Sequence, residues 1–114
     1  MDEIKEKANK LIRALNEGIQ DKNILEELFW YTLVQCQGHS FYTVKNLEFT
    51  YTIKGNEMFV DRKNKSITKA TAVLAFSKAL ELQKEGKKVT GPKKLGTFGA
   101  SYLYPVFIEL GIIN

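Results

Sequence analysis

The sequence predicts an α+β fold in which two N-terminal helices precede a β-hairpin, three helical segments and a short terminal strand. The apolar residues follow a helical period up to residue 36, alternate with polar residues over 47–53, and return to a helical period after residue 68. The chain of 114 residues has no linker-like tract, so residues 1–114 are expected to form one domain. Within it we distinguish a helical part, 1–40, from a hairpin-plus-helices part, 41–114.

The first two helices are predicted from spacing and capping. Residues 3–17 place Ile4, Leu11 and Leu15 on one face of a helix. Asp21 is expected to cap a second helix over 22–36, because an aspartate carboxylate accepts hydrogen bonds from the free amides of a first turn. The second helix is apolar on more than one face, which indicates that it packs on two sides.

A β-hairpin is predicted over residues 47–62. Residues 47–53 alternate apolar and polar side chains, as a strand with one buried face does. Gly55-Asn56 then predicts a type II′ turn, which requires glycine at its first position, and residues 57–62 form the return strand. A further short strand at 41–44 is an open alternative.

Three helical segments are predicted after the hairpin. Either Ser66 or Thr68 is expected to cap a helix over 69–84. A short helix over 92–96 begins with a proline, which suits the first helical position. A last helix spans about 101–110.

Pro105 limits where the last helix begins. Deep inside a helix it removes a hydrogen bond and clashes with the preceding turn, at a cost of about 3 kcal/mol or more. We therefore expect the helix to start no earlier than Ser101 or to bend. Ile112-Ile113 predicts a terminal strand, which would pair with the hairpin.

Positive charge is concentrated in one part of the chain. Residues 1–60 carry seven basic and nine acidic side chains, whereas residues 61–94 carry ten basic and three acidic ones. The formal net charge is +4. Clustered cations favour an anionic partner because they release the counterions of phosphates on binding. The alternative is a lysine-rich solvated surface.

The segment from Thr68 to Ile113 resembles helix-turn-helix and winged-helix DNA-binding domains. Residues 92–95 correspond to the first helix of the pair, Gly96 to its turn, and residues 101–110 to the recognition helix. The segment departs from that pattern in three ways: its turn is one residue longer, Pro105 interrupts the second helix, and that helix has no Arg, Lys, Asn or Gln to read base edges.

This resemblance implies a small nucleic-acid-binding protein, with DNA as the expected partner and a role as a regulator or mobile-element accessory protein. The expected phosphate contacts are Arg62, Lys63, Lys65, Lys87, Lys88, Lys93 and Lys94. The expected groove-facing residues are Ser101, Tyr102 and Tyr104. The alternative is a protein-interaction module or homodimer that uses the aromatic, glycine-rich C-terminal segment. The chain has thirteen aromatic residues. Some of them could stack on bases or form a protein-binding surface, and the alternative is that they form a well-packed core.

The chain also resembles a group of short, uncharacterised proteins from Gram-positive bacteria and their mobile elements. The residues that carry this likeness are Phe49-Thr-Tyr-Thr-Ile-Lys-Gly55, Lys65-Ser-Ile-Thr68, Gly91-Pro-Lys-Lys-Leu-Gly96 and Gly99-Ala-Ser-Tyr-Leu-Tyr-Pro-Val-Phe107. This second likeness implies no activity.

No residue pattern predicts an enzyme. Cys36 and His39 are the one nucleophile and base close in sequence, but no third group orients them, so a buried structural thiol is expected. One cysteine and one histidine do not complete a closed zinc site, and we expect neither a metal nor another cofactor. The chain has no apolar run of membrane length and no export signal, so we expect a cytoplasmic protein with no membrane partner.

Overall fold

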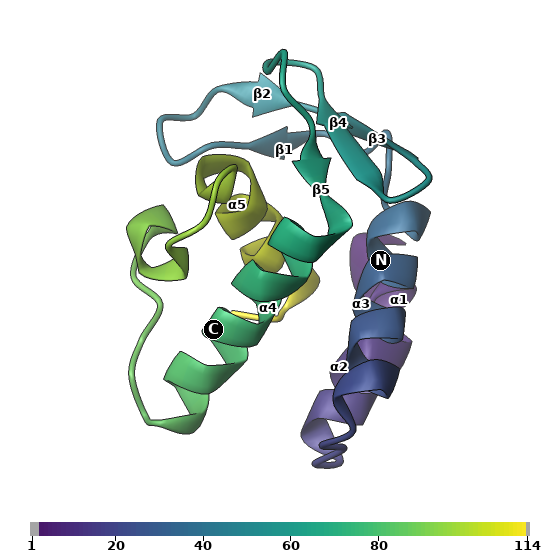
Figure 1. The fold of residues 1–114 in the computed structure, drawn as a ribbon, viewed down its shortest axis with the longest axis vertical. Helices are drawn as coiled ribbons and strands as arrows, with labels where there is room; N and C mark the ends of the chain where they lie inside the picture. Colours follow the sequence, from purple (N-terminus) through teal and green to yellow (C-terminus); the bar gives the residue numbers. More distant parts are fainter. Residues whose placement is uncertain (1–2, 114) are drawn as a thin grey trace.

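The fold is mixed helix and sheet, as the sequence predicts. The computed structural model describes residues 3–113. Its helical elements are α1 (Glu3–Lys7), α2 (Asn9–Asn16), α3 (Lys22–Gln35), α4 (Lys69–Lys84), the 3-10 helix η1 (Pro92–Leu95) and α5 (Ala100–Leu110). Figure 1 shows the strands gathered at one end of the molecule, across the ends of the longer helices.

Three phenylalanine rings join the three longest helices in the core. Phe29 of α3 stacks on Phe76 of α4 with ring centroids 4.3 Å apart, and it meets Phe107 of α5 edge to face at 5.5 Å. All three side chains are almost fully buried. Each such aromatic pair contributes about 1 kcal/mol beyond the burial of its surface. These contacts hold α3, α4 and α5 around one centre.

The N-terminal helices differ from expectation in one detail. The helix expected over 3–17 is divided at Ala8 into α1 and α2, although backbone hydrogen bonds of 3.0 Å continue on both sides of that residue. The second helix and its cap are confirmed. The carboxylate of Asp21 accepts hydrogen bonds from the amides of Asn23 and Ile24, at 2.9 and 3.2 Å.

The predicted hairpin is confirmed, but both of its strands are shorter than expected: the return strand ends at Val60 and not at residue 62. β3 (Tyr51–Lys54) pairs with β4 (Glu57–Val60), which pairs in turn with β5 (Ile67–Thr68). Gly55 has φ 60°, as a type II′ turn requires at its first position.

The strand expected over 47–53 is interrupted at Thr50. The amide of Thr50 donates to the carboxylate of Asp61 at 3.1 Å and so leaves the regular ladder. The two residues before this break form β2 (Glu48–Phe49), which pairs with β1 (Phe41–Tyr42) in a separate two-stranded sheet. The open alternative of a strand at 41–44 is therefore correct for its first two residues.

The helical segments after the hairpin agree with the sequence. Thr68 caps α4 by accepting a hydrogen bond from the amide of Thr71 at 3.2 Å, whereas Ser66 donates to Glu57. α5 begins at Ala100, one residue before the expected limit, and Pro105 lies inside it. Since proline has no amide hydrogen, the exposed Ser101 carbonyl lacks its usual helical partner.

The predicted terminal strand at Ile112-Ile113 is wrong. Both residues follow the end of α5, and both of their amides donate to the carbonyl of Phe107, at 3.0 and 3.3 Å. These hydrogen bonds close the helix in a turn and leave no amide of the two residues for a sheet. The two isoleucine side chains are buried in the core instead.

The entry to α5 is packed against the sheet through Gly99. A Cβ atom at this position would lie 2.4 Å from Cδ1 of Ile67 in β5, too close for any real contact. Gly99 also has φ +77°, a left-handed conformation that disfavours other residues. Two independent features therefore favour glycine here, its left-handed φ and the Ile67 side chain against it, and this contact brings the start of α5 against β5.

Replacing Gly99 with Ala is expected to destabilise the protein by about 2–4 kcal/mol, the sum of backbone strain and overpacking against Ile67. Gly96→Ala is the matched control. Gly96 has a similar φ of +66° but no neighbour within 4 Å, so its expected cost is only about 1 kcal/mol. Urea denaturation of both variants measures the difference, and equal losses would contradict the close packing.

Candidate nucleic-acid interface

The loop after β4 meets the segment that precedes α5. The ammonium group of Lys63 lies 4.7 Å from the ring centroid of Phe98 and 5.7 Å from that of Tyr102. The ammonium group of Lys65 lies 5.0 Å from the Phe98 ring. We call Lys63, Lys65, Phe98 and Tyr102 the lysine–aromatic cluster. Three of its members belong to the site predicted from sequence.

One aromatic ring of the cluster packs against the core, and the other is exposed. The ring of Tyr102 is partly buried and packs edge to face on the buried Phe49, with centroids 5.0 Å apart. Phe98 is 42% exposed, which is unusual for an aromatic ring so close to the core. Sequence analysis did not select Phe98 as a site residue. Its position between Gly96 and Gly99, in a loop just before a helix, is the sequence feature that could have indicated it.

A shallow hollow of about 310 Å³ lies beside the cluster. It is lined by Pro92, Lys93, Gly96, Thr97, Gly99, Ala100 and Ser101. The hollow brings together Lys93 and Ser101, two further residues of the predicted site. Phe98 is the residue between two lining positions, so the hollow and the cluster are adjacent along the chain.

Two more predicted basic residues lie near this surface. Lys94 is exposed in η1, next to Lys93. Arg62 is exposed in the same loop as Lys63, and its guanidinium lies 3.5 Å from the carbonyl oxygen of Glu48 in β2. Arg62 is thus directed towards the β1–β2 sheet rather than towards Phe98.

The remaining predicted residues are not part of this surface. Lys87 and Lys88 follow the last turn of α4, and the 16 residues of that helix separate its two ends by about 24 Å. Lys87 forms an ion pair with Glu85 at 3.3 Å. Figure 1 shows the loop after α4 leaving the end of that helix which is remote from the strands. The predicted site is therefore divided into two parts.

Tyr104 has a structural contact in place of the expected groove-facing position. Its ring is partly buried, and its hydroxyl lies 3.4 Å from the carbonyl oxygen of Val89 in the loop between α4 and η1. The outer face of α5 exposes Ser101, Ile108 and Glu109. None of these side chains offers the two adjacent hydrogen-bonding groups, at least one of them a donor, with which Asn, Gln or Arg read a base edge.

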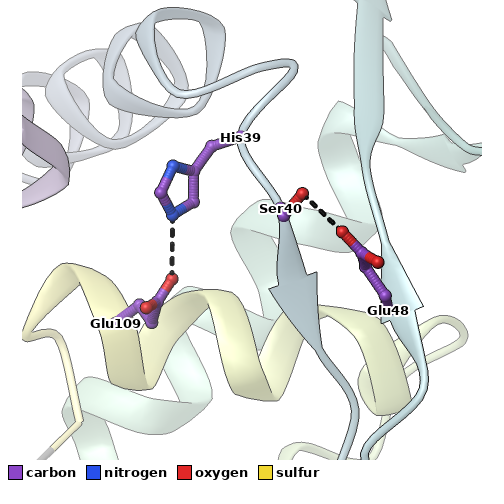
Figure 2. Close-up of polar contacts among 4 residues, drawn as sticks. All are labelled: His39, Ser40, Glu48 and Glu109. Carbon is purple, nitrogen blue, oxygen red and sulfur yellow. Dashed lines mark hydrogen bonds and ion pairs between the residues drawn. The ribbon is translucent and has the colours of Figure 1, made fainter.

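Glu109 also connects α5 to the segment before β1. Its carboxylate lies 3.4 Å from Nε2 of His39, as Figure 2 shows. In the same view the hydroxyl of Ser40 donates to the carboxylate of Glu48 at 2.8 Å. These are two separate contacts, since Ser40 is directed to Glu48 and not to His39. The two contacts connect the residues just before β1 to α5 and to β2. They do not form a serine–histidine pair.

Cys36 is a buried thiol, as expected. Its side chain is fully inaccessible, and burial raises the pKa of the thiol to about 11. The nearby Lys7 opposes this rise and Glu109 adds to it, both to a smaller extent. The thiol therefore keeps its proton at neutral pH and is a poor nucleophile. Burial also raises the pKa of Tyr51, whose hydroxyl donates to the carbonyl of Leu33 at 2.6 Å.

The described part of the chain contains no group of three or more His, Cys, Asp or Glu side chains placed to hold a metal ion. Within the same residues, no helix combines the length and the apolar character needed to cross a membrane.

The raised pKa of Cys36 predicts a specific pH dependence of stability. In the folded chain the thiol ionises near pH 11, whereas in the unfolded chain it ionises near its ordinary value of 9.0. Between these values the unfolded state binds fewer protons, so the free energy of unfolding falls as pH rises. We expect wild type to lose about 2 kcal/mol more than Cys36→Ala between pH 8.5 and 11. Denaturation of both proteins across this range measures it, and parallel profiles would contradict it.

The chain was also compared with known proteins. No family model, curated protein or solved structure matches it. The resemblance to winged-helix domains therefore stays a hypothesis, and the candidate site is defined by the geometry of the lysine–aromatic cluster and the adjacent η1.

Proposed function

We propose that the protein binds nucleic acid through the lysine–aromatic cluster and the neighbouring lysines of η1. The observation that carries this proposal is the meeting of two lysines from the loop after β4 with Phe98, just before α5, and Tyr102, in the first turn of α5, at distances of 4.7 to 5.7 Å. Aromatic rings beside ammonium groups are a common feature of nucleic-acid-binding surfaces, because bases and phosphates are both available to them.

The absence of ion-pair partners for these lysines within residues 3–113 supports the proposal. Among the described residues, no carboxylate lies within ion-pair distance of the ammonium groups of Lys63, Lys65, Lys93 or Lys94. Lys7, Lys69 and Lys87, by contrast, each have a glutamate partner. Other described lysines, such as Lys5 and Lys10, are also without a partner among these residues, so what distinguishes Lys63, Lys65, Lys93 and Lys94 is their place beside Phe98 and in η1. Unpaired cations on one surface attract phosphates, and the release of condensed counterions favours binding.

The winged-helix arrangement is part of this proposal. In it α4 is the scaffold helix, η1 takes the place of the first helix of the pair, and α5 that of the second. The loop after β4 would act as the basic wing. The expected partner on this view is DNA, and the expected role is that of a regulator or a mobile-element accessory protein.

The competing proposal, a protein partner on the aromatic C-terminal segment, has less surface available to it. Most apolar residues of that segment are core residues, namely Leu95, Leu103, Val106, Phe107, Leu110, Ile112 and Ile113. Phe98 and Ile108 are the large apolar side chains of the segment that are exposed. Two exposed apolar side chains supply little of the apolar centre that stable protein interfaces have.

We expect the protein to bind a mixed-sequence oligonucleotide with an affinity that falls steeply as salt rises. The double variant Lys63→Ala/Lys65→Ala should weaken binding and lower the slope of log Kd against log salt by about 1.5. Fluorescence anisotropy over a series of salt concentrations, with both duplex and single-stranded probes, measures this.

The matched control is Lys5→Ala/Lys10→Ala. It removes the same charge from exposed positions on α1 and α2, away from the cluster, and should leave affinity nearly unchanged. Absence of binding at low salt would overturn the proposed function. Equal losses in the two double variants would show that net charge alone, and not this surface, governs binding.

A further inference from the structure

The elements that would have to read a duplex are poorly suited to that task. η1 is a single 3-10 turn of four residues, and α5 exposes Ser101, Ile108 and Glu109. Glu109 would repel phosphates at a groove edge. A duplex also keeps its bases stacked on one another, so the exposed ring of Phe98 would have no base face to contact.

An unpaired strand fits the same surface better. Its bases are free to stack on an aromatic ring, and its phosphates remain available to nearby cations. The ammonium groups of Lys63 and Lys65 lie 4.7 and 5.0 Å from the Phe98 centroid. Lysine has a flexible four-carbon stem, so each ammonium group is able to leave the ring for a phosphate while a base takes its place.

We propose that the lysine–aromatic cluster selects unpaired nucleic acid, with one base stacked on Phe98 and the adjacent phosphates bound by Lys63 and Lys65. This inference depends on the proposed function and names its substrate class. Tyr102 packs edge to face against the buried Phe49, which holds its ring in place within the cluster. Selectivity arises because the stacking interaction is available to a single strand and not to a duplex.

The test compares single-stranded and duplex DNA of the same sequence, about twelve nucleotides long, at one low salt concentration. The single strand should bind wild type about tenfold more tightly than the duplex, as expected for one base stacked on an aromatic ring. Phe98→Ala should remove this difference by weakening single-strand binding about tenfold, while duplex affinity stays the same.

Phe59→Ala is the matched control for the loss of an exposed ring. Phe59 in β4 is 40% exposed and has Lys54 at 5.9 Å from its centroid, but it is not part of the cluster. It should leave the affinity for both probes unchanged. Thermal unfolding of each variant verifies that it is folded.

Two further measurements do not depend on the stability of the alanine variant. An abasic strand of equal length keeps the phosphates and lacks the bases, so it should bind wild type about tenfold more weakly than the normal strand does. Phe98→Trp should retain affinity, and its fluorescence should be quenched by the single strand and not by the duplex. Trp30 is buried and provides a constant background.

Equal affinity of wild type for both probes, equal affinity for the abasic and normal strands, or parallel losses for both probes in Phe98→Ala would overturn the inference. Nucleic-acid binding itself would stand in these cases. No binding of either probe at low salt would overturn the proposed function as well.

Discussion

The close approach of Gly99 to Ile67 is the contact on which the candidate interface depends. The two residues are far apart in sequence, yet no space for a single Cβ atom remains between them. Because Gly99 lies against β5, its neighbour Phe98 comes to lie beside the loop that leads into that strand. Lys63 and Lys65 in that loop therefore reach the Phe98 ring. The surface is thus a consequence of the packing of Gly99 on the Ile67 side chain and does not depend on ion pairs.

The C-terminal segment has two roles in this structure. One face of α5 contributes Leu103, Val106 and Phe107 to the core, where Phe107 meets Phe29. Phe98, just before α5, and Ser101, in its first turn, are exposed. An apolar, aromatic segment can therefore anchor a helix and still expose an aromatic ring, because the two sets of side chains lie at different positions along it.

Local patterns predicted most of the fold, and tertiary contacts account for what they missed. The caps Asp21 and Thr68 and the turn at Gly55 act over a few residues, so the sequence reveals them. The break at Thr50 comes from a hydrogen bond to Asp61, and the loss of the terminal strand from the Phe107 carbonyl. For the site, the excess of basic residues over 61–94 indicated Lys63 and Lys65. It could not show that their ammonium groups lie near the Phe98 ring, because that position depends on the packing of Gly99.

Chemical-shift mapping by NMR locates a bound strand on the protein without altering any residue. Titration of labelled protein with a short oligonucleotide should shift the amide resonances of residues 63–66 and 97–102. Residues 42–47, at the exposed end of the β1–β2 sheet, should change little. Shifts confined to that end, or no shifts within the lysine–aromatic cluster at saturating oligonucleotide, would contradict the account.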